Sequence, residues 1–264
     1  MNLKFLCTQV TQIVVQTGKF IQQQQKKITL DKIEQKGIND FVTSIDKEAE
    51  QRLIGFLTPL IQNAGFIAEE NTVADSNAEY KWIIDPIDGT TNYIHGVSPF
   101  AISIALQHKG KTILGIIYEI SLNEVFYAHE DAKGAYLNDR PIKVSDQSEH
   151  NQSLIATGFP YNDFTRLEKY MESLNFFMHQ SQGLRRLGSA ATDLAYVACG
   201  RFEAFYEYSL KPWDVAAGAY LVQKAGGKTS DFTGGDKFVF GGEIVAANSN
   251  YYDTFLKEVQ RHLL

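Results

Sequence analysis

Two aspartates, Asp85 and Asp88, follow an apolar run in the segment WIIDPIDGTTN. Carboxylates this close together repel each other unless a cation lies between them. The carbonyl of Ile87 can face the same point, and oxygen ligands of this kind suit Mg²⁺, which prefers octahedral oxygen coordination. The spacing therefore predicts a divalent-cation site just beyond a buried strand that ends at Asp85. The alternative is an ordinary turn, because Asp-Gly is a common turn dipeptide.

The next residues, Gly89-Thr90-Thr91-Asn92, are typical of the start of a short helix. The first turn of a helix leaves backbone N–H groups unpaired, and such groups bind phosphate readily. A glycine at this position lets the backbone approach a ligand closely. The segment as a whole therefore predicts a phosphoryl group held against divalent cations.

Acidic residues are also concentrated at two other places, the Glu69-Glu70 pair after GFIA and Asp214 in KPWDVAAGAYLV. Each has a structural explanation that competes with metal binding. An aspartate in the first turn of a helix is stabilising by itself, and an acidic pair after a strand is typical of a solvated surface. The residue types alone leave both interpretations open.

These residues must be positioned by a mixed α and β fold. The 264 residues contain 44% apolar and 21% charged residues, which are ordinary values for one large domain or two packed halves. Strand patterns between 100 and 143 predict an antiparallel sheet that ends in a hairpin. From Ser153 strands and helices alternate, which predicts a second sheet covered by helices. We expect one catalytic unit over 1–264, with a subdomain boundary near 145–152.

The amino-terminal part is predicted to be helical. Apolar residues recur at helical spacing through the first twenty-odd residues, and a second helix should follow Thr43-Ser44 until Pro59 interrupts it. Between them the polar stretch 22–39, which contains QQQQKK, is expected to be mobile.

Composition argues against several classes of protein. A net charge of −6 and the lack of a lysine and arginine stripe make nucleic-acid binding an unfavourable interpretation. No apolar run approaches the ~20 residues needed to span a bilayer. The two cysteines lie far apart in apolar surroundings, which favours core thiols in a reducing compartment, the cytoplasm.

Three segments together, WIIDPIDGTTNYIHG with its upstream glutamate pair, LGSAATDLAYVACGRFEAFYE and WDVAAGAYLVQKAGG, resemble the inositol monophosphatase family, most closely its bacterial members. The resemblance runs from about Asp46 to Gly227. It implies a layered αβαβα sugar-phosphatase fold in a homodimer. It also implies Mg²⁺-dependent, lithium-inhibited hydrolysis of a small phosphorylated substrate, with inositol monophosphate as the first expectation.

The resemblance also implies roles for individual residues. Two to three Mg²⁺ ions would be held by the side chains or carbonyls of Glu69, Asp85, Ile87, Asp88 and Asp214, with Asp46 near the third ion. Thr90, paired with Glu69, would orient the attacking water, so the catalytic residues would be Glu69, Thr90 and Asp88. The substrate would contact Gly89, Thr90, Ser189, Ala190 and Glu207. Lys36 is a candidate for the lysine that the family often places in the loop between 22 and 39.

The expected reaction is in-line attack of a metal-activated water, without a covalent phosphoenzyme. Two alternatives remain open. The substrate could be 3′-phosphoadenosine phosphate, fructose bisphosphate or histidinol phosphate, which related Mg²⁺ phosphatases hydrolyse. The fold could instead serve as a non-catalytic interaction module.

Overall fold

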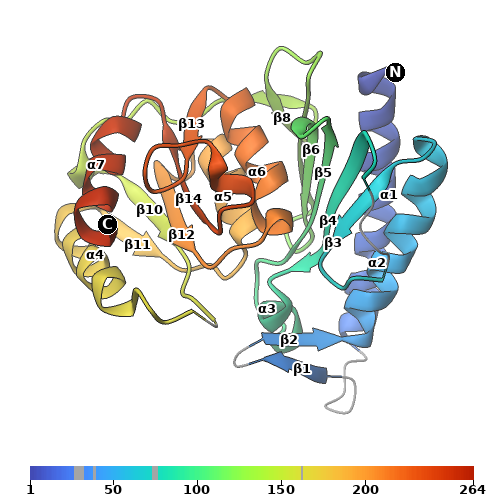
Figure 1. Ribbon diagram of the computed structural model, residues 1–264, viewed down its shortest axis with the longest axis horizontal. Coiled ribbons are helices and arrows are strands. Elements are labelled where there is room, and N and C mark those ends of the chain that lie inside the picture. The colour runs from blue at the N-terminus through green and yellow to red at the C-terminus, as the bar shows by residue number, and fades with distance from the viewer. Residues whose placement is uncertain (27–32, 38–39, 73–76, 162) are drawn as a thin grey trace.

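The computed structural model describes residues 1–26, 33–37, 40–72, 77–161 and 163–264, which fold into five layers (Figure 1). Two sheets are separated by one pair of helices, and a further pair covers the outer face of each sheet. Three apolar clusters fill the spaces between these layers. The αβαβα arrangement expected from the resemblance is therefore confirmed.

The first layer consists of helices α1 (Leu3–Gln25) and α2 (Ser44–Leu57), which pack on one face of the larger sheet. The apolar positions of α1 are buried as the helical spacing predicts. Thr43 and Asp46 form a capping box at the start of α2, and Pro59 lies in the 3₁₀ turn Thr58–Leu60 that ends it. Both helix predictions are confirmed.

The segment 22–39 is only partly described. Helix α1 continues to Gln25, and β1 (Ile33–Gly37) pairs antiparallel with β2 (Asp40–Thr43). Residues 27–32 and 38–39 lie outside the described residues, so the expectation of mobility is not addressed there.

The larger sheet follows chain order. Its seven strands are β3 (Gly65–Ala68), β4 (Tyr80–Asp88), β5 (Ala101–His108), β6 (Lys111–Glu119), β7 (Glu124–His129), β8 (Ala135–Leu137) and β9 (Arg140–Ile142). Neighbours are antiparallel except β3 and β4, which are parallel. Asn138 and Asp139, both at positive φ, form the predicted turn between β8 and β9.

The smaller sheet is mixed. Its order is β11 (Gly183–Arg185), β10 (Leu154–Thr157), β12 (Ala204–Tyr208), β14 (Glu243–Asn248) and β13 (Gly227–Ser230). Helices α4 (Leu167–Gln180) and α7 (Tyr252–Leu263) cover its outer face. The predicted second sheet covered by helices is thus confirmed.

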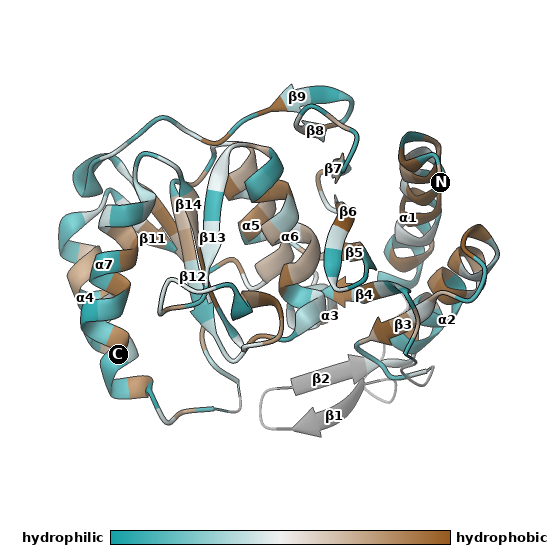
Figure 2. Cartoon of the chain, turned by 45° about the horizontal axis from the view of Figure 1, so that its top comes forward, coloured by the Kyte–Doolittle hydropathy of each residue, from teal (hydrophilic) through white to brown (hydrophobic). Residues whose placement is uncertain are grey.

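The middle layer consists of α5 (Ala190–Ala198) and α6 (Pro212–Lys224). Most residues of both helices are buried, and a helix covered on almost every side is apolar all round, as the colouring of Figure 2 shows for much of each helix. They pack closely at Gly218, where an added Cβ would lie 2.5 Å from Leu194 Cβ. Helix α6 follows the smaller sheet's strand β12 and lies between the sheets, against β4, β5 and β6 of the larger sheet and β13 and β14 of the smaller. The subdomain boundary near 145–152 falls between β9 and β10 and remains a prediction.

Among the described helices, none has the length and apolar character that crossing a membrane requires.

Candidate active site

A cavity of about 320 Å³ opens between the two sheets, near the end of β4 and the starts of α5 and α6. Ten of the residues that the sequence analysis assigned to metal, catalysis or substrate line it: Glu69, Asp85, Ile87, Asp88, Gly89, Thr90, Ser189, Ala190, Glu207 and Asp214. Asp46, expected near the third ion, is outside this lining and contacts Thr90. Residues 145 positions apart in the chain therefore meet at one cavity, from Glu69 to Asp214. The convergence that the hypothesis required is present, while the role of each residue stays a prediction.

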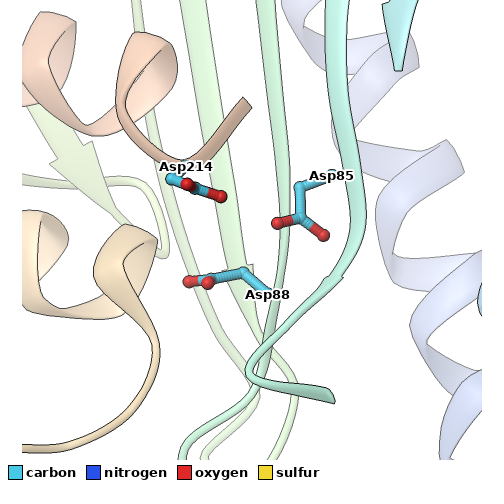
Figure 3. Close-up of side chains that lie close together, drawn as sticks. All are labelled: Asp85, Asp88 and Asp214. Carbon is cyan, nitrogen blue, oxygen red and sulfur yellow. The ribbon is translucent and has the colours of Figure 1, made fainter. Parts of the chain in front are cut away.

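Three carboxylates in this cavity lie close together, those of Asp85, Asp88 and Asp214 (Figure 3). One oxygen of each lies within 4.8 Å of the others, a separation that a shared cation can span. Carboxylate oxygens are the ligands that Mg²⁺ prefers. The donor set of this chain therefore fits a magnesium ion.

A β-bulge in β4 brings two of these carboxylates to the same side. Side chains three residues apart on a regular strand point to opposite faces. Here Asp85 pairs with Ser103 and Asp88 pairs with Ala101, so the β4 side carries one extra residue. Such an insertion re-aims the side chains beyond it. The expectation that the strand ends at Asp85 is wrong, because β4 continues through the bulge to Asp88.

The charges of the site repel each other. Burial raises the pKa of Asp85 well above its usual range, and repulsion from Glu69, Asp88 and Asp214 raises it further. Burial likewise raises the pKa of Asp88 to about 6, although hydrogen bonds from Ser189 and the amides of Ala190 and Ala191 oppose the increase. Repulsion among converging carboxylates is what a bound divalent cation relieves.

The start of α5 holds Asp88 in place. Ser189 Oγ donates to Asp88 Oδ2 at 2.5 Å, and the Ala191 N–H donates to the same oxygen at 2.7 Å. Ser189 is also the N-cap of α5. Ser189 and Ala190 therefore both donate hydrogen bonds to Asp88, which is a metal-ligand candidate. Their contact with substrate remains a prediction.

The hydroxyl of Thr90 lies close to two oxygen atoms that the sequence analysis did not pair with it. Its Oγ1 lies 3.1 Å from Asp46 Oδ1 and 3.0 Å from the Ile87 carbonyl. The pairing of Thr90 with Glu69 stays a prediction. Asp46 reaches Thr90 through the capping box of α2, because the Thr43 N–H donates to Asp46 Oδ2 at 2.9 Å and leaves Asp46 Oδ1 facing α3 (Thr90–His95).

Asp214 is positioned by the first turn of α6. Its Oδ2 accepts a hydrogen bond of 2.6 Å from the Lys211 N–H. Ser103 Oγ donates to the Trp213 carbonyl at 3.0 Å, which fixes the start of α6 to β5. The structural interpretation of Asp214 as a helix-start residue and its place in the acidic cluster are therefore both correct.

The loop that carries Gly89 is packed against the start of α5. Gly89 has φ +93°, and an added Cβ would lie 3.0 Å from the Gly188 carbonyl oxygen. Asn92 Nδ2 donates to the carbonyls of Pro99 and Leu187 at 2.8 and 2.7 Å. Sequence reasoning did not predict this bridging role of Asn92, although its place directly after the two threonines was a signal.

One wall of the cavity contains Glu207 and two residues that the sequence analysis did not assign to the site. Burial raises the pKa of Glu207 well above its usual range, with repulsion from Asp214 next in importance. Gly158 leaves room for it, because a Cβ there would lie 2.0 Å from the Glu207 carboxylate. Arg186 and Asp193 line the same cavity. The signal for Asp193 was an acidic residue inside the apolar helix AATDLAYVA.

Comparison with known proteins decides the family. A family model described as the inositol monophosphatase family matches residues 3–264. The chain belongs to the inositol monophosphatase family. Its motifs and five-layered fold agree with this assignment, so the resemblance inferred from the sequence is confirmed.

Relatives of this inositol monophosphatase family member carry two kinds of name. The putative Nus factor SuhB of Neisseria meningitidis serogroup B is 44% identical over 88% of this chain and 89% of its own. An inositol-1-monophosphatase of Mesorhizobium japonicum is 35% identical over 96% of both chains. The solved structure of the Anabaena inositol monophosphatase has a TM-score of 0.86 and 34% identity, covering 99% of this chain and 98% of the other.

Proposed function

We propose that this protein is a Mg²⁺-dependent phosphatase that hydrolyses inositol monophosphate to inositol and phosphate. The observation that carries the proposal is the convergence of Asp85, Asp88 and Asp214 in one cavity beside the Gly89-Thr90 loop. Membership of the inositol monophosphatase family supports it independently.

The metal ligands would be Asp85, Asp88 and Asp214, with Glu69 beside Asp85 and the Ile87 carbonyl at the same edge. Bound Mg²⁺ would lower the pKa of a water and neutralise charge on the phosphoryl oxygens. The chain itself holds the ligands rigidly, because each of the three aspartates accepts a backbone N–H bond, from Ile87, Ala191 and Lys211 respectively.

The hydroxyl of Thr90 is suited to orient the attacking water. When the hydroxyl donates a hydrogen bond to Asp46 Oδ1, its lone pairs are free to accept a hydrogen bond from a water in the cavity. The water then points its own lone pair toward the phosphoryl group. Backbone N–H groups of Gly89 and Thr90 would hold the phosphate oxygens, as at other helix starts.

The substrate side favours a small polyol. A cavity of about 320 Å³ is near the lower end of the range for small-molecule sites. Glu207 offers carboxylate oxygens that accept hydrogen bonds from hydroxyl groups, and inositol carries a hydroxyl on each ring carbon that is not phosphorylated.

Phosphate release provides the test. The protein should hydrolyse inositol 1-phosphate when Mg²⁺ is present, and lithium should inhibit this hydrolysis. Inositol 1-phosphate should be preferred over 3′-phosphoadenosine phosphate, fructose bisphosphate and histidinol phosphate. Asp88→Asn should lower kcat by about a hundredfold or more while circular dichroism stays unchanged, because it removes a charge aimed at the metal. Asp131→Asn changes an exposed aspartate and serves as the control. A folded Asp88→Asn protein with normal turnover would exclude the mechanism.

The names of some relatives favour a second candidate, a Nus-factor role on the same fold. Expression of this protein in Neisseria meningitidis depleted of its putative Nus factor SuhB would separate the candidates. Rescue by both the wild type and Asp88→Asn would favour a role that needs no hydrolysis, whereas rescue by the wild type alone would favour the phosphatase. The homodimer and the cytoplasmic location stay predictions.

A further inference from the structure

One oxygen of a buried carboxylate on α5 has no hydrogen-bond partner within the described part of the chain. The side chain of Asp193 is 1% exposed and lines the cavity, and its Oδ1 has no hydrogen-bond partner among the described residues. Buried polar atoms in native proteins are almost always hydrogen-bonded, so an exception indicates a missing water or ligand. Its position beside the metal-ligand candidates, within interaction range of Asp88 and Glu207, favours a ligand.

Arg186 presents a matching donor from the same wall. Its Nε is buried without a partner among the described residues, while Nη2 donates to Tyr161 Oη at 2.6 Å. Its guanidinium also lies over Gly188, where a Cβ would come within 2.4 Å of Nη1. Electrostatic attraction links Arg186 to both Asp193 and Glu207. The side chain is therefore held in place while its Nε–H group has no partner within the described part of the chain.

We propose that Asp193 is a specificity-determining residue which, together with Arg186, binds a hydroxyl group on the leaving-group side of the substrate. A hydroxyl donates one hydrogen bond and accepts up to two, so one group can satisfy both the carboxylate oxygen and the Nε–H. Rotation about the broad χ2 torsion of an aspartate can turn the unpartnered oxygen toward the cavity. The inference rests on the proposed phosphatase function and names the substrate class, polyol monophosphates.

The alternative is a structural water that bridges Asp193 and Arg186. Such a water would stabilise the wall equally for every substrate, because it does not depend on what the leaving group carries. The two explanations therefore differ in whether the effect of a substitution depends on substrate hydroxyls.

The experiment compares inositol 1-phosphate with cyclohexyl phosphate, which has the same ring size and no hydroxyl group. The wild type should prefer the inositol ester in kcat/KM. Asp193→Ala should lower kcat/KM for inositol 1-phosphate by about tenfold to a hundredfold and leave cyclohexyl phosphate hydrolysis unchanged, because only the first ester loses a charge-assisted hydrogen bond. Asp193→Asn, which keeps the volume and one carbonyl oxygen, should give a smaller loss of the same kind.

Glu203→Gln is the matched control, since Glu203 is a buried carboxylate 7% exposed that lies outside the cavity lining. It should leave the ratio of the two kcat/KM values unchanged. Equal losses on both esters, or no loss in the folded Asn variant, would overturn the inference while hydrolysis itself continues. Failure of the wild type to hydrolyse either ester with Mg²⁺ would instead overturn the phosphatase function and this inference with it.

Discussion

The hydroxyl of Thr90 and the carboxylate of Asp46 act as one unit if they orient a water together. We expect Thr90→Ala and Asp46→Asn each to lower kcat by about a hundredfold, the scale of assisted proton transfer. The double variant should lose little more than either single variant. Steady-state kinetics of the three variants measures this coupling.

Thr43→Ala is the control for this cycle, because Thr43 caps α2 through Asp46 without lining the cavity. It should lower stability by about 1 kcal/mol and leave kcat nearly intact. Fully additive losses in the double variant would show that Thr90 and Asp46 contribute separately.

Asp193 should make stability depend on pH. Burial raises its pKa well above the usual range, with repulsion from Glu207 and Asp88 adding to this. The folded state therefore holds the proton more tightly than the unfolded state, so the stabilisation is full below about pH 4 and is lost as pH rises through the folded pKa. Asp193→Asn cannot ionise and avoids this loss.

Urea unfolding at several pH values tests the point. The free energy of unfolding of Asp193→Asn minus that of the wild type should increase from pH 4 to pH 8. Asp131→Asn, an exposed substitution, serves for comparison. A difference that is constant with pH would contradict the assignment.

For individual residues, the sequence predicted which acidic side chains belong to the site better than it predicted which residues those side chains contact. Asp85, Asp88 and Asp214 could be found because carboxylates in an apolar setting suggest metal, and the family motif carries them. Asp46 as the partner of Thr90 depends on a contact between distant segments. The electrostatic attraction between Asp193 and Arg186 depends on how the loop before α5 folds, which no local spacing records.

Among the elements, the contact between α5 and α6 sets the position of two cavity walls. Gly218 has no room for a methyl group beside Leu194, and α5 carries Ser189 and Asp193 while α6 carries Asp214. Gly218→Ala should therefore cost about 1–3 kcal/mol of stability by overpacking. Displacement of the walls should also lower kcat.

Gly55→Ala is the matched control, because Gly55 lies inside α2 with nothing within 4 Å of an added Cβ. It should stabilise the protein by up to about 1 kcal/mol through helix propensity. Thermal unfolding of both variants gives the comparison. Equal effects of the two substitutions would mean that the close approach at Gly218 is relaxed in solution.

Local patterns were sufficient for elements whose signals are local. The apolar repeat of α1, Pro59 after α2 and the hairpin that ends the antiparallel sheet each depend on signals within a few residues, and each is confirmed. The bulge in β4 and the parallel pairing of β3 with β4 depend on register against other strands, so the same patterns did not predict them.

At the scale of the whole molecule, the metal-ligand candidates come from two distant parts of the chain. Asp85 and Asp88 lie on β4 of the larger sheet, and Asp214 lies on α6 of the middle layer. Unfolding separates them, so Mg²⁺ should bind the folded state only. At a Mg²⁺ concentration 100 times Kd the stabilisation should be about 2.7 kcal/mol. Tm should rise with added Mg²⁺ and fall with a chelator.

The same titration on Asp88→Asn provides the control, since removal of one carboxylate should abolish most of the rise. A Tm that does not respond to Mg²⁺ in the wild type would argue against a metal shared by these carboxylates. Calcium in place of Mg²⁺ would distinguish selective binding from general relief of charge repulsion.

The five-layered arrangement could be predicted as a whole only through the family resemblance. Alternating strand and helix patterns indicated two sheets, but the placement of α6 against the larger sheet follows from packing across the interior. Gly115 on β6 permits that close approach, because an added Cβ there would lie 2.9 Å from the Ala217 carbonyl oxygen of α6, and its place in the sequence carries no sign of what it faces.

The extra residue between Asp85 and Asp88 has a consequence for how such a centre arises or disappears in evolution. Substitutions neither create nor remove it, because it is a change in chain length within one strand. Deletion of Ile87 alone would restore a regular pleat with both carboxylates still on one face, two residues apart, but it would remove the backbone carbonyl between them while every acidic codon stays present.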